Sequence, residues 1–103
     1  MTNTRPPAVA GAFYPGNPEI LAATVDQFLS DATATPATQA KALVVPHAGY
    51  VYSGATAGRA YALLAPWRTQ IRRVILLGPT HRVAVDGIAV PQTAAFATPL
   101  GPI

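Results

Sequence analysis

Two apolar runs of β-type residues stand out along the chain, at 42–45 and 73–77, and each leads within a few residues to a histidine. A parallel strand that is buried on both faces has an unbroken apolar pattern of this kind. The pattern therefore predicts two strands, 42–46 and 73–77, in a parallel sheet. Because ligands collect beyond the carboxyl ends of such strands, we expect His47 and His81 to converge on one crevice.

A helix is predicted to begin after Asn17, which is a favoured N-cap residue. Pro18 then occupies the first helical position, and Glu19 lies in the first turn, where the helix dipole favours an anion. Apolar residues at helical spacing follow, namely Leu21, Val25, Phe28 and Leu29. We expect this helix to cover one face of the sheet.

A second helix is predicted between the two runs, at 53–64, with Ser53 as its N-cap and its end before Pro66. Strand, helix and strand form a βαβ unit with a right-handed crossover. Residues 5–16 are expected to form an ordered loop against the sheet, and Asp86 and Gly87 a turn before a short strand at 88–90. The cluster at 98–103 is expected to turn toward another strand.

The predicted fold class is thus α/β, with a partial parallel (βαβ) sheet and flanking helices. The chain has 103 residues, of which 50% are hydrophobic and 11% charged, which is typical of a single folded domain. A parallel sheet needs helices on both of its faces, and two helices are few for that purpose. We therefore expect residues 1–103 to form one incomplete domain.

Composition also narrows the possible partners. The net charge of +3 rests on few charges, with one tight cluster at Arg68, Arg72 and Arg73, which argues against nucleic acid. The absence of cysteine excludes disulfides and thiolate ligands within this chain. No apolar stretch approaches the roughly 20 residues of a membrane helix, and no signal-peptide pattern begins the chain. The expected location is cytoplasmic; the oligomeric state stays open.

The loop at 47–56 lies between a predicted strand and a predicted helix, where phosphate-binding loops and nucleophile elbows occur. It has two glycines five residues apart, but Ala55 and Thr56 follow where a phosphate-binding loop needs lysine and a hydroxyl residue. Ser53 lacks the nucleophile-elbow pattern. What remains is an anion site at the helix start, with Tyr52, Ser53 and Gly54 as its candidate residues.

Metal binding by His47 and His81 is the sharper hypothesis. Two imidazoles and one carboxylate form the facial triad of non-haem iron(II) oxygenases. Asp86 is the acid nearest to His81 in the sequence, although an Asp-Gly pair is more often a simple turn. We expect the missing ligand to lie outside this chain. Aromatic residues in the same loops suit a pocket for a small organic molecule or serve as packing anchors: Phe13, Tyr14, Tyr50 and Tyr52.

Four motifs in register resemble the N-terminal part of the Memo family, whose prokaryotic members are named AmmeMemoRadiSam system protein B. They are residues 7–15 (PAVAGAFYP), 46–54 (PHAGYVYSG), 77–81 (LGPTH) and 98–101 (TPLG). The resemblance implies a fold like that of the class III extradiol dioxygenases, with a non-haem metal pocket at the strand ends. It also implies that His47 and His81 occupy metal-ligand positions, with iron(II) as the favoured metal.

The chain departs from the family pattern in two ways. Family domains are more than twice as long, and further pocket residues are expected in the part beyond this chain. Phe13 stands where animal members carry tryptophan. Three functions stay open: a metal-pocket protein of unassigned reaction, an extradiol-type dioxygenase acting on a small aromatic substrate, and a non-catalytic scaffold that binds a peptide or small anion.

Overall fold

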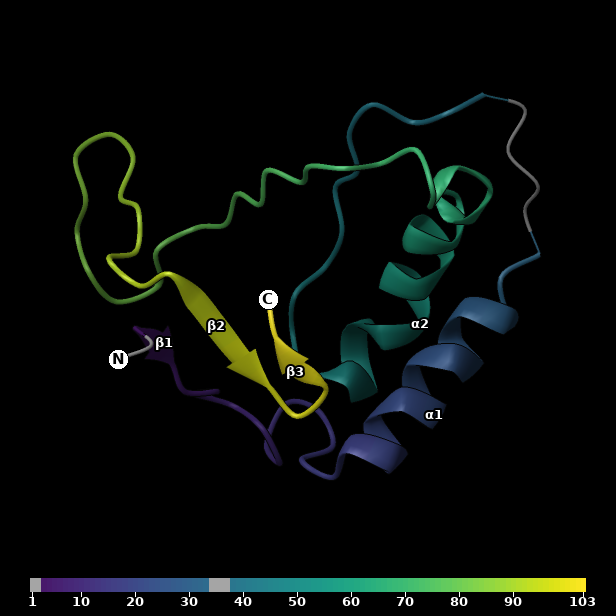
Figure 1. The fold of residues 1–103 in the computed structure, drawn as a ribbon, viewed down its shortest axis with the longest axis horizontal. Coiled ribbons are helices and arrows are strands. Elements are labelled where there is room, and N and C mark those ends of the chain that lie inside the picture. The colour runs from purple at the N-terminus through teal and green to yellow at the C-terminus, as the bar shows by residue number, and fades with distance from the viewer. Residues whose placement is uncertain (1–2, 34–37) are drawn as a thin grey trace.

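The computed structural model describes residues 3–33 and 38–103 and contains two helices beside a small sheet (Figure 1). The helices are α1, Pro18–Ser30, and α2, Tyr50–Ala62, and a short 3₁₀ turn follows at Ala65–Trp67. The strands are β1, Thr4–Arg5, β2, Ala95–Thr98, and β3, Gly101–Pro102. No helix in the described residues has the length and apolar character needed to cross a bilayer.

The sheet joins the two ends of the sequence in the order β1-β2-β3. β1 pairs parallel with β2, and β2 pairs antiparallel with β3. Phe96 and Ile103 exchange two backbone hydrogen bonds of 2.8 Å across the second pair. The predicted turn after Thr98 is confirmed, and Gly101 adopts a φ of +115° there. A mixed α/β fold with a partly parallel sheet is therefore confirmed.

The positions of the strands differ from the prediction. The runs 42–46 and 73–77 are extended but belong to no strand ladder, and the same holds for 88–90. Figure 1 shows the two runs as plain tubes on either side of α2 in the chain. A strand needs a hydrogen-bonded neighbour, and β2 instead takes its partners from the first and last described residues. The expected βαβ ladder is thus absent from the described structure.

Helix α1 begins where the sequence predicts. The Asn17 side-chain oxygen accepts a 3.0 Å hydrogen bond from the Ile20 backbone N–H, and Pro18 is the first helical residue. Helix α2 begins three residues earlier than predicted, with Gly49 rather than Ser53 as its N-cap. The carbonyl oxygen of Phe13 accepts the Tyr50 N–H at 2.8 Å, so the 5–16 loop supports this early start.

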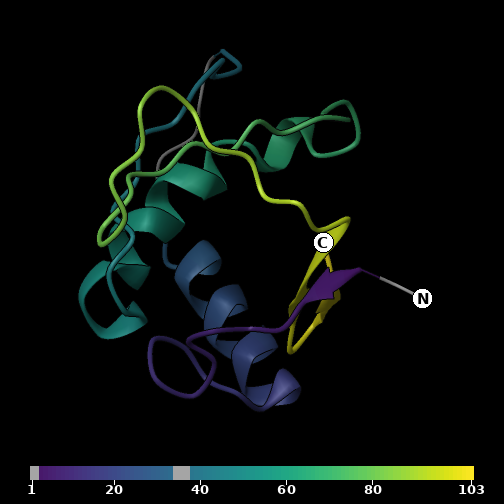
Figure 2. The same cartoon turned by 90° about the vertical axis from the view of Figure 1, so that its left-hand side faces the viewer.

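The two helices pack on each other, and the three strands gather on the opposite side of the molecule (Figure 2). Phe28 of α1 faces Gly54 and Gly58 of α2, which lie four residues apart on one side of that helix. Leu21, also on α1, is only 4% exposed. The expectation that α1 covers the sheet is therefore wrong: its main partner is α2.

Candidate metal centre

The two histidines of the chain lie side by side at the ends of the extended runs. His47 Nε2 and His81 Nε2 are 3.2 Å apart, although 34 residues separate them in the sequence. Their ring centroids are 5.2 Å apart and the ring planes are inclined by 46°. The rings therefore present their Nε2 edges to each other. Both are solvent-exposed, so small ions reach them directly.

This spacing matches what a shared metal ion requires. Histidine nitrogens bind a first-row metal at about 2.0–2.1 Å, so two ligands at cis or tetrahedral angles lie roughly 2.9–3.4 Å apart. The observed 3.2 Å falls within that range. Without a metal, one Nε2–H can donate to the other Nε2, depending on the tautomers. The pair thus fits a metal as two adjacent ligands.

Acidic groups are scarce around the histidines. The only acids of the chain are Glu19, Asp26, Asp31 and Asp86, so residues 32–85 contain none. Asp31 accepts a 2.7 Å hydrogen bond from the Gln27 side chain at the end of α1. Within 3–33 and 38–103, no group of three or more potential ligands comes together. Asp86 is accordingly not gathered with the two histidines.

The three residues predicted to bind an anion occupy different environments on α2. Tyr52 is 85% exposed, whereas Ser53 is 5% exposed and Gly54 is covered by Phe28. The Ser53 hydroxyl accepts the Ala48 N–H at 2.9 Å. The Ser53 backbone N–H donates to the Gly49 carbonyl oxygen at 3.0 Å. The Ser53 groups are thus already hydrogen-bonded within the chain, and the anion site stays a prediction.

Aromatic rings of the loops and helices form a cluster that the sequence did not reveal in full. Tyr50 lies 5.7 Å from Tyr14 and 6.0 Å from Phe28, centroid to centroid. A hollow of about 320 Å³ opens between the 11–15 loop, Thr24 and Phe28 of α1, and the first turn of α2. Burial, with smaller contributions from Tyr14 and Tyr61, raises the pKa of Tyr50 above its ordinary value of 10.0.

The raised pKa of Tyr50 predicts a pH dependence of stability. Above pH 10 the unfolded chain loses the Tyr50 proton while the folded chain retains it, so the free energy of unfolding falls as the pH rises. Tyr50→Phe should make this alkaline decline less steep and leave stability at pH 7 little changed. Urea unfolding at a series of pH values measures the decline. Tyr52→Phe, at an exposed position, is the control and should not alter the slope.

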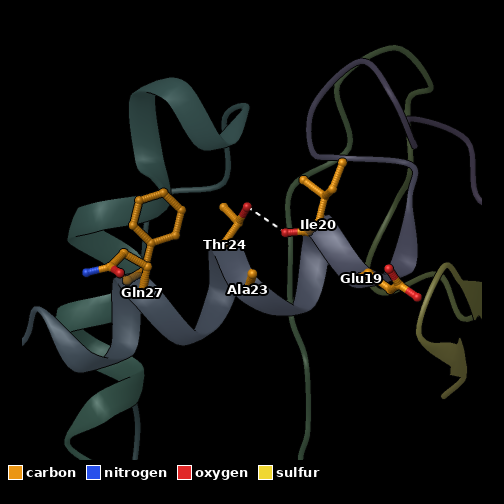
Figure 3. A pocket seen from close by; sticks show the side chains of 6 residues that line it. Glu19, Ile20, Ala23, Thr24 and Gln27 are labelled. Atoms are coloured by element: carbon orange, nitrogen blue, oxygen red, sulfur yellow. Dashed lines mark hydrogen bonds between the residues drawn. The ribbon is translucent and has the colours of Figure 1, made fainter.

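A second hollow lies on α1, and neither histidine is among its lining residues (Figure 3). It has a volume of about 500 Å³, and Figure 3 shows Thr24 donating a hydrogen bond to the Ile20 carbonyl oxygen along its floor. Glu19 is its only ionisable residue. The hollow is lined by a single face of one helix: Glu19, Ile20, Ala23, Thr24, Gln27 and Phe28. It offers no convergent set of catalytic groups.

The packing of Phe28 against Gly54 and Gly58 is the main feature of the fold that was not predicted from the sequence. Gly54 and Gly58 have the i, i+4 spacing that places two residues on one helix face. A Cβ at either position would approach Phe28 more closely than ordinary contact allows. The spacing was available as a signal, but the identity of the facing residue was not.

Comparison with known proteins shows which family this chain resembles. The family model described as "Memo-like protein" matches residues 5–103. The "Protein memo-1 homolog" of Caenorhabditis elegans is 39% identical over 99 residues, which are 96% of this chain and 27% of that protein. The "MEMO1 family protein" of Archaeoglobus fulgidus is 41% identical over 99 residues, 96% of this chain and 35% of the relative.

A similar result holds for "Protein MEMO1" of Xenopus tropicalis, which is 41% identical over 91 residues, 88% of this chain and 30% of that protein. The chain thus spans about a third of the length of the curated relatives it matches.

Proposed function

The chain belongs to the Memo-like protein family, and from that premise we propose that it supplies two histidine ligands, His47 and His81, to a non-haem metal pocket. The observation that carries the proposal is the 3.2 Å separation of the two Nε2 atoms. Two neutral imidazoles with converging Nε2 atoms are a donor set that suits divalent first-row metals. No other pair of imidazoles exists in the sequence.

Iron(II) is the metal we propose. Iron bound by two imidazoles and a carboxylate is redox-active and keeps open positions for small molecules. The carboxylate would come from outside this chain, because residues 32–85 contain none and no acid of the described residues is gathered with the histidines. The role of this chain's own residues is to hold the two rings in adjacent positions. Ser53 assists by fixing the loop after His47 through its hydrogen bond with the Ala48 N–H.

Metal titration of the purified chain tests the ligand assignment. Nitrogen sites bind Zn(II) more tightly than Fe(II), so Zn(II) is the sensitive probe, and Fe(II) is titrated without oxygen to test metal identity. His47→Ala and His81→Ala should each weaken Zn(II) binding by roughly tenfold or more, because each leaves a single imidazole ligand. The double variant should show no specific binding by calorimetry.

Asp86→Asn is the matched control, since Asp86 is near His81 in sequence but is not gathered with the histidines. Its metal affinity should equal that of the unchanged chain. Protons compete with metal for imidazole nitrogens, so binding should weaken as the pH is lowered. Equal Zn(II) affinity in the double histidine variant and the unchanged chain would refute the proposal. So would a failure of the unchanged chain to bind Zn(II).

A further inference from the structure

The aromatic hollow beside the start of α2 is bordered by rings from three separate segments. Tyr14 comes from the 11–15 loop, Phe28 from α1 and Tyr50 from the first turn of α2. The ring planes of Tyr14 and Tyr50 are inclined by 40°, and those of Phe28 and Tyr50 by 75°. Rings at such angles form walls rather than a stack. Each of the three residues is half-buried, so part of its surface is open to a ligand.

The lining of this hollow carries no charge. Phe13, which is 47% exposed, is a fourth aromatic residue in it. The other lining residues are small, apolar or hydroxyl-bearing: Gly11, Ala12, Pro15, Thr24 and Val51. The lining has no guanidinium or ammonium group to neutralise an anion, and the faces of aromatic rings carry negative partial charge. The hollow therefore suits an apolar molecule or a cation rather than an anion.

The charges in the surrounding sequence favour a cation over a neutral molecule. Residues 6–40, which supply most of the lining, contain three of the four acids and none of the basic residues. This stretch is therefore negative in a chain whose net charge is +3. One of its acids, Glu19, borders the adjoining hollow on α1, and Thr24 and Phe28 line both hollows. A cation is attracted to a region of this charge.

We propose that the hollow lined by Tyr14, Phe28 and Tyr50 binds a quaternary ammonium group. Aromatic faces attract such a cation within about 6 Å of the ring centroids, as in the recognition of choline and methyl-lysine. A primary ammonium is strongly hydrated and fits an apolar lining less well. The volume of about 320 Å³ is at the small end of the range for ligand pockets, which suits a group of this size. This inference does not depend on metal binding.

Calorimetric titration of the unchanged chain with choline tests the proposal. The matched ligand is the neutral analogue of choline in which a carbon atom replaces the nitrogen. Choline should bind roughly tenfold more tightly than this analogue, because both fill the same space but only choline has a charge that the rings attract. Raising the ionic strength should weaken choline binding, because salt screens the acids of residues 6–40.

A short peptide with one trimethyllysine, titrated in parallel, distinguishes two sources of the same group. Tighter binding of the peptide than of choline would assign the quaternary ammonium to a modified protein. Tighter binding of choline would assign it to a small molecule.

Variants of Tyr14 locate the site. Tyr14→Leu removes the ring but keeps an apolar side chain, so choline affinity should fall roughly fivefold or more. Tyr14→Phe keeps the ring face and should stay within about threefold of the unchanged chain. Tyr52→Leu is the matched control, because Tyr52 is 85% exposed on α2 and does not line the hollow. Its choline affinity should equal that of the unchanged chain.

Three results would overturn the inference. The first is the absence of choline binding to the unchanged chain. The second is equal affinity for choline and its neutral analogue. The third is undiminished choline binding by a folded Tyr14→Leu variant, with circular dichroism as the measure of folding. The first two use the unchanged chain, so they decide the question even where a variant loses its fold.

Discussion

Gly58→Ala is expected to lower the free energy of unfolding by about 2 kcal/mol, even though alanine favours helices more than glycine does. A Cβ at position 58 would lie 2.8 Å from Phe28 Cβ and 2.9 Å from the Phe28 carbonyl oxygen. These atoms are fixed to the backbone of α1, so rotation of the side chain cannot relieve the clash. The two helices would have to separate. Urea unfolding followed by circular dichroism measures the change.

Gly78→Ala is the control for this effect. No atom lies within 4 Å of a Cβ at that position, so its free energy of unfolding should stay within about 0.5 kcal/mol of the unchanged chain. A neutral Gly58→Ala variant would show that the helices do not pack as closely as the structure describes.

Gly54 provides a contrast at the other end of the same side chain. A Cβ there would meet the ring atoms Cε2 and Cζ of Phe28 rather than its backbone. Phe28→Leu removes those atoms, so it should partly restore the stability of Gly54→Ala but not of Gly58→Ala. A double-mutant cycle for each pair measures the difference. Equal rescue at both positions would contradict the assignment of the two contacts.

Leu21→Ala is expected to cost about 3 kcal/mol of unfolding free energy, the second large effect. Leu21 is the one buried hydrophobic residue in the described ranges, with 4% of its surface exposed. Truncation removes apolar contact and leaves a cavity that neighbouring groups fill only in part. In so small a core, few other contacts can offset the loss. Thermal and urea unfolding of the variant measure it.

The neighbouring residue supplies the matched comparison for Leu21. Ile20 lies on the same helix and is 57% exposed. Ile20→Ala should therefore cost less than about 1 kcal/mol, since little apolar surface is buried there. Equal costs at the two positions would mean that α1 does not hold Leu21 inside the fold.

The expectations that the structure confirms depend on short-range interactions. Asn17, Pro18 and Glu19 predict the start of α1, because capping hydrogen bonds join residues three or four positions apart. The turn after Thr98 follows from the same kind of local chemistry, with the Thr98 hydroxyl donating to the Gly101 carbonyl oxygen at 2.7 Å. Neighbouring residues in the sequence contain all the information that these features need.

The expectations that failed depend on contacts between distant residues. Ser53 was predicted to cap α2, but the Phe13 carbonyl oxygen binds the Tyr50 N–H and the helix begins earlier. The run 73–77 has a strand-like composition, yet a ladder requires a partner strand at the correct distance. Composition alone does not specify which partner is present.

The histidine pair lies between these two cases. Their equivalent positions after two apolar runs predicted that the rings would meet, and the structure places their Nε2 atoms 3.2 Å apart. The reason given for the meeting, a shared parallel ladder, is not present in the described residues. Their role as metal ligands stays a prediction that the Zn(II) titration addresses.

The sequence by itself determined helix α1 with its cap, the C-terminal turn and the family motifs, because each is encoded by residues close together in the chain. Only the tertiary structure decided that β2 pairs with Thr4–Arg5, that Phe28 lies against Gly54 and Gly58, and how near the two imidazoles come. Such contacts join residues separated by 26 or more positions, for example Phe28 and Gly54. Their formation depends on the balance of burial and hydrogen bonding over the whole fold.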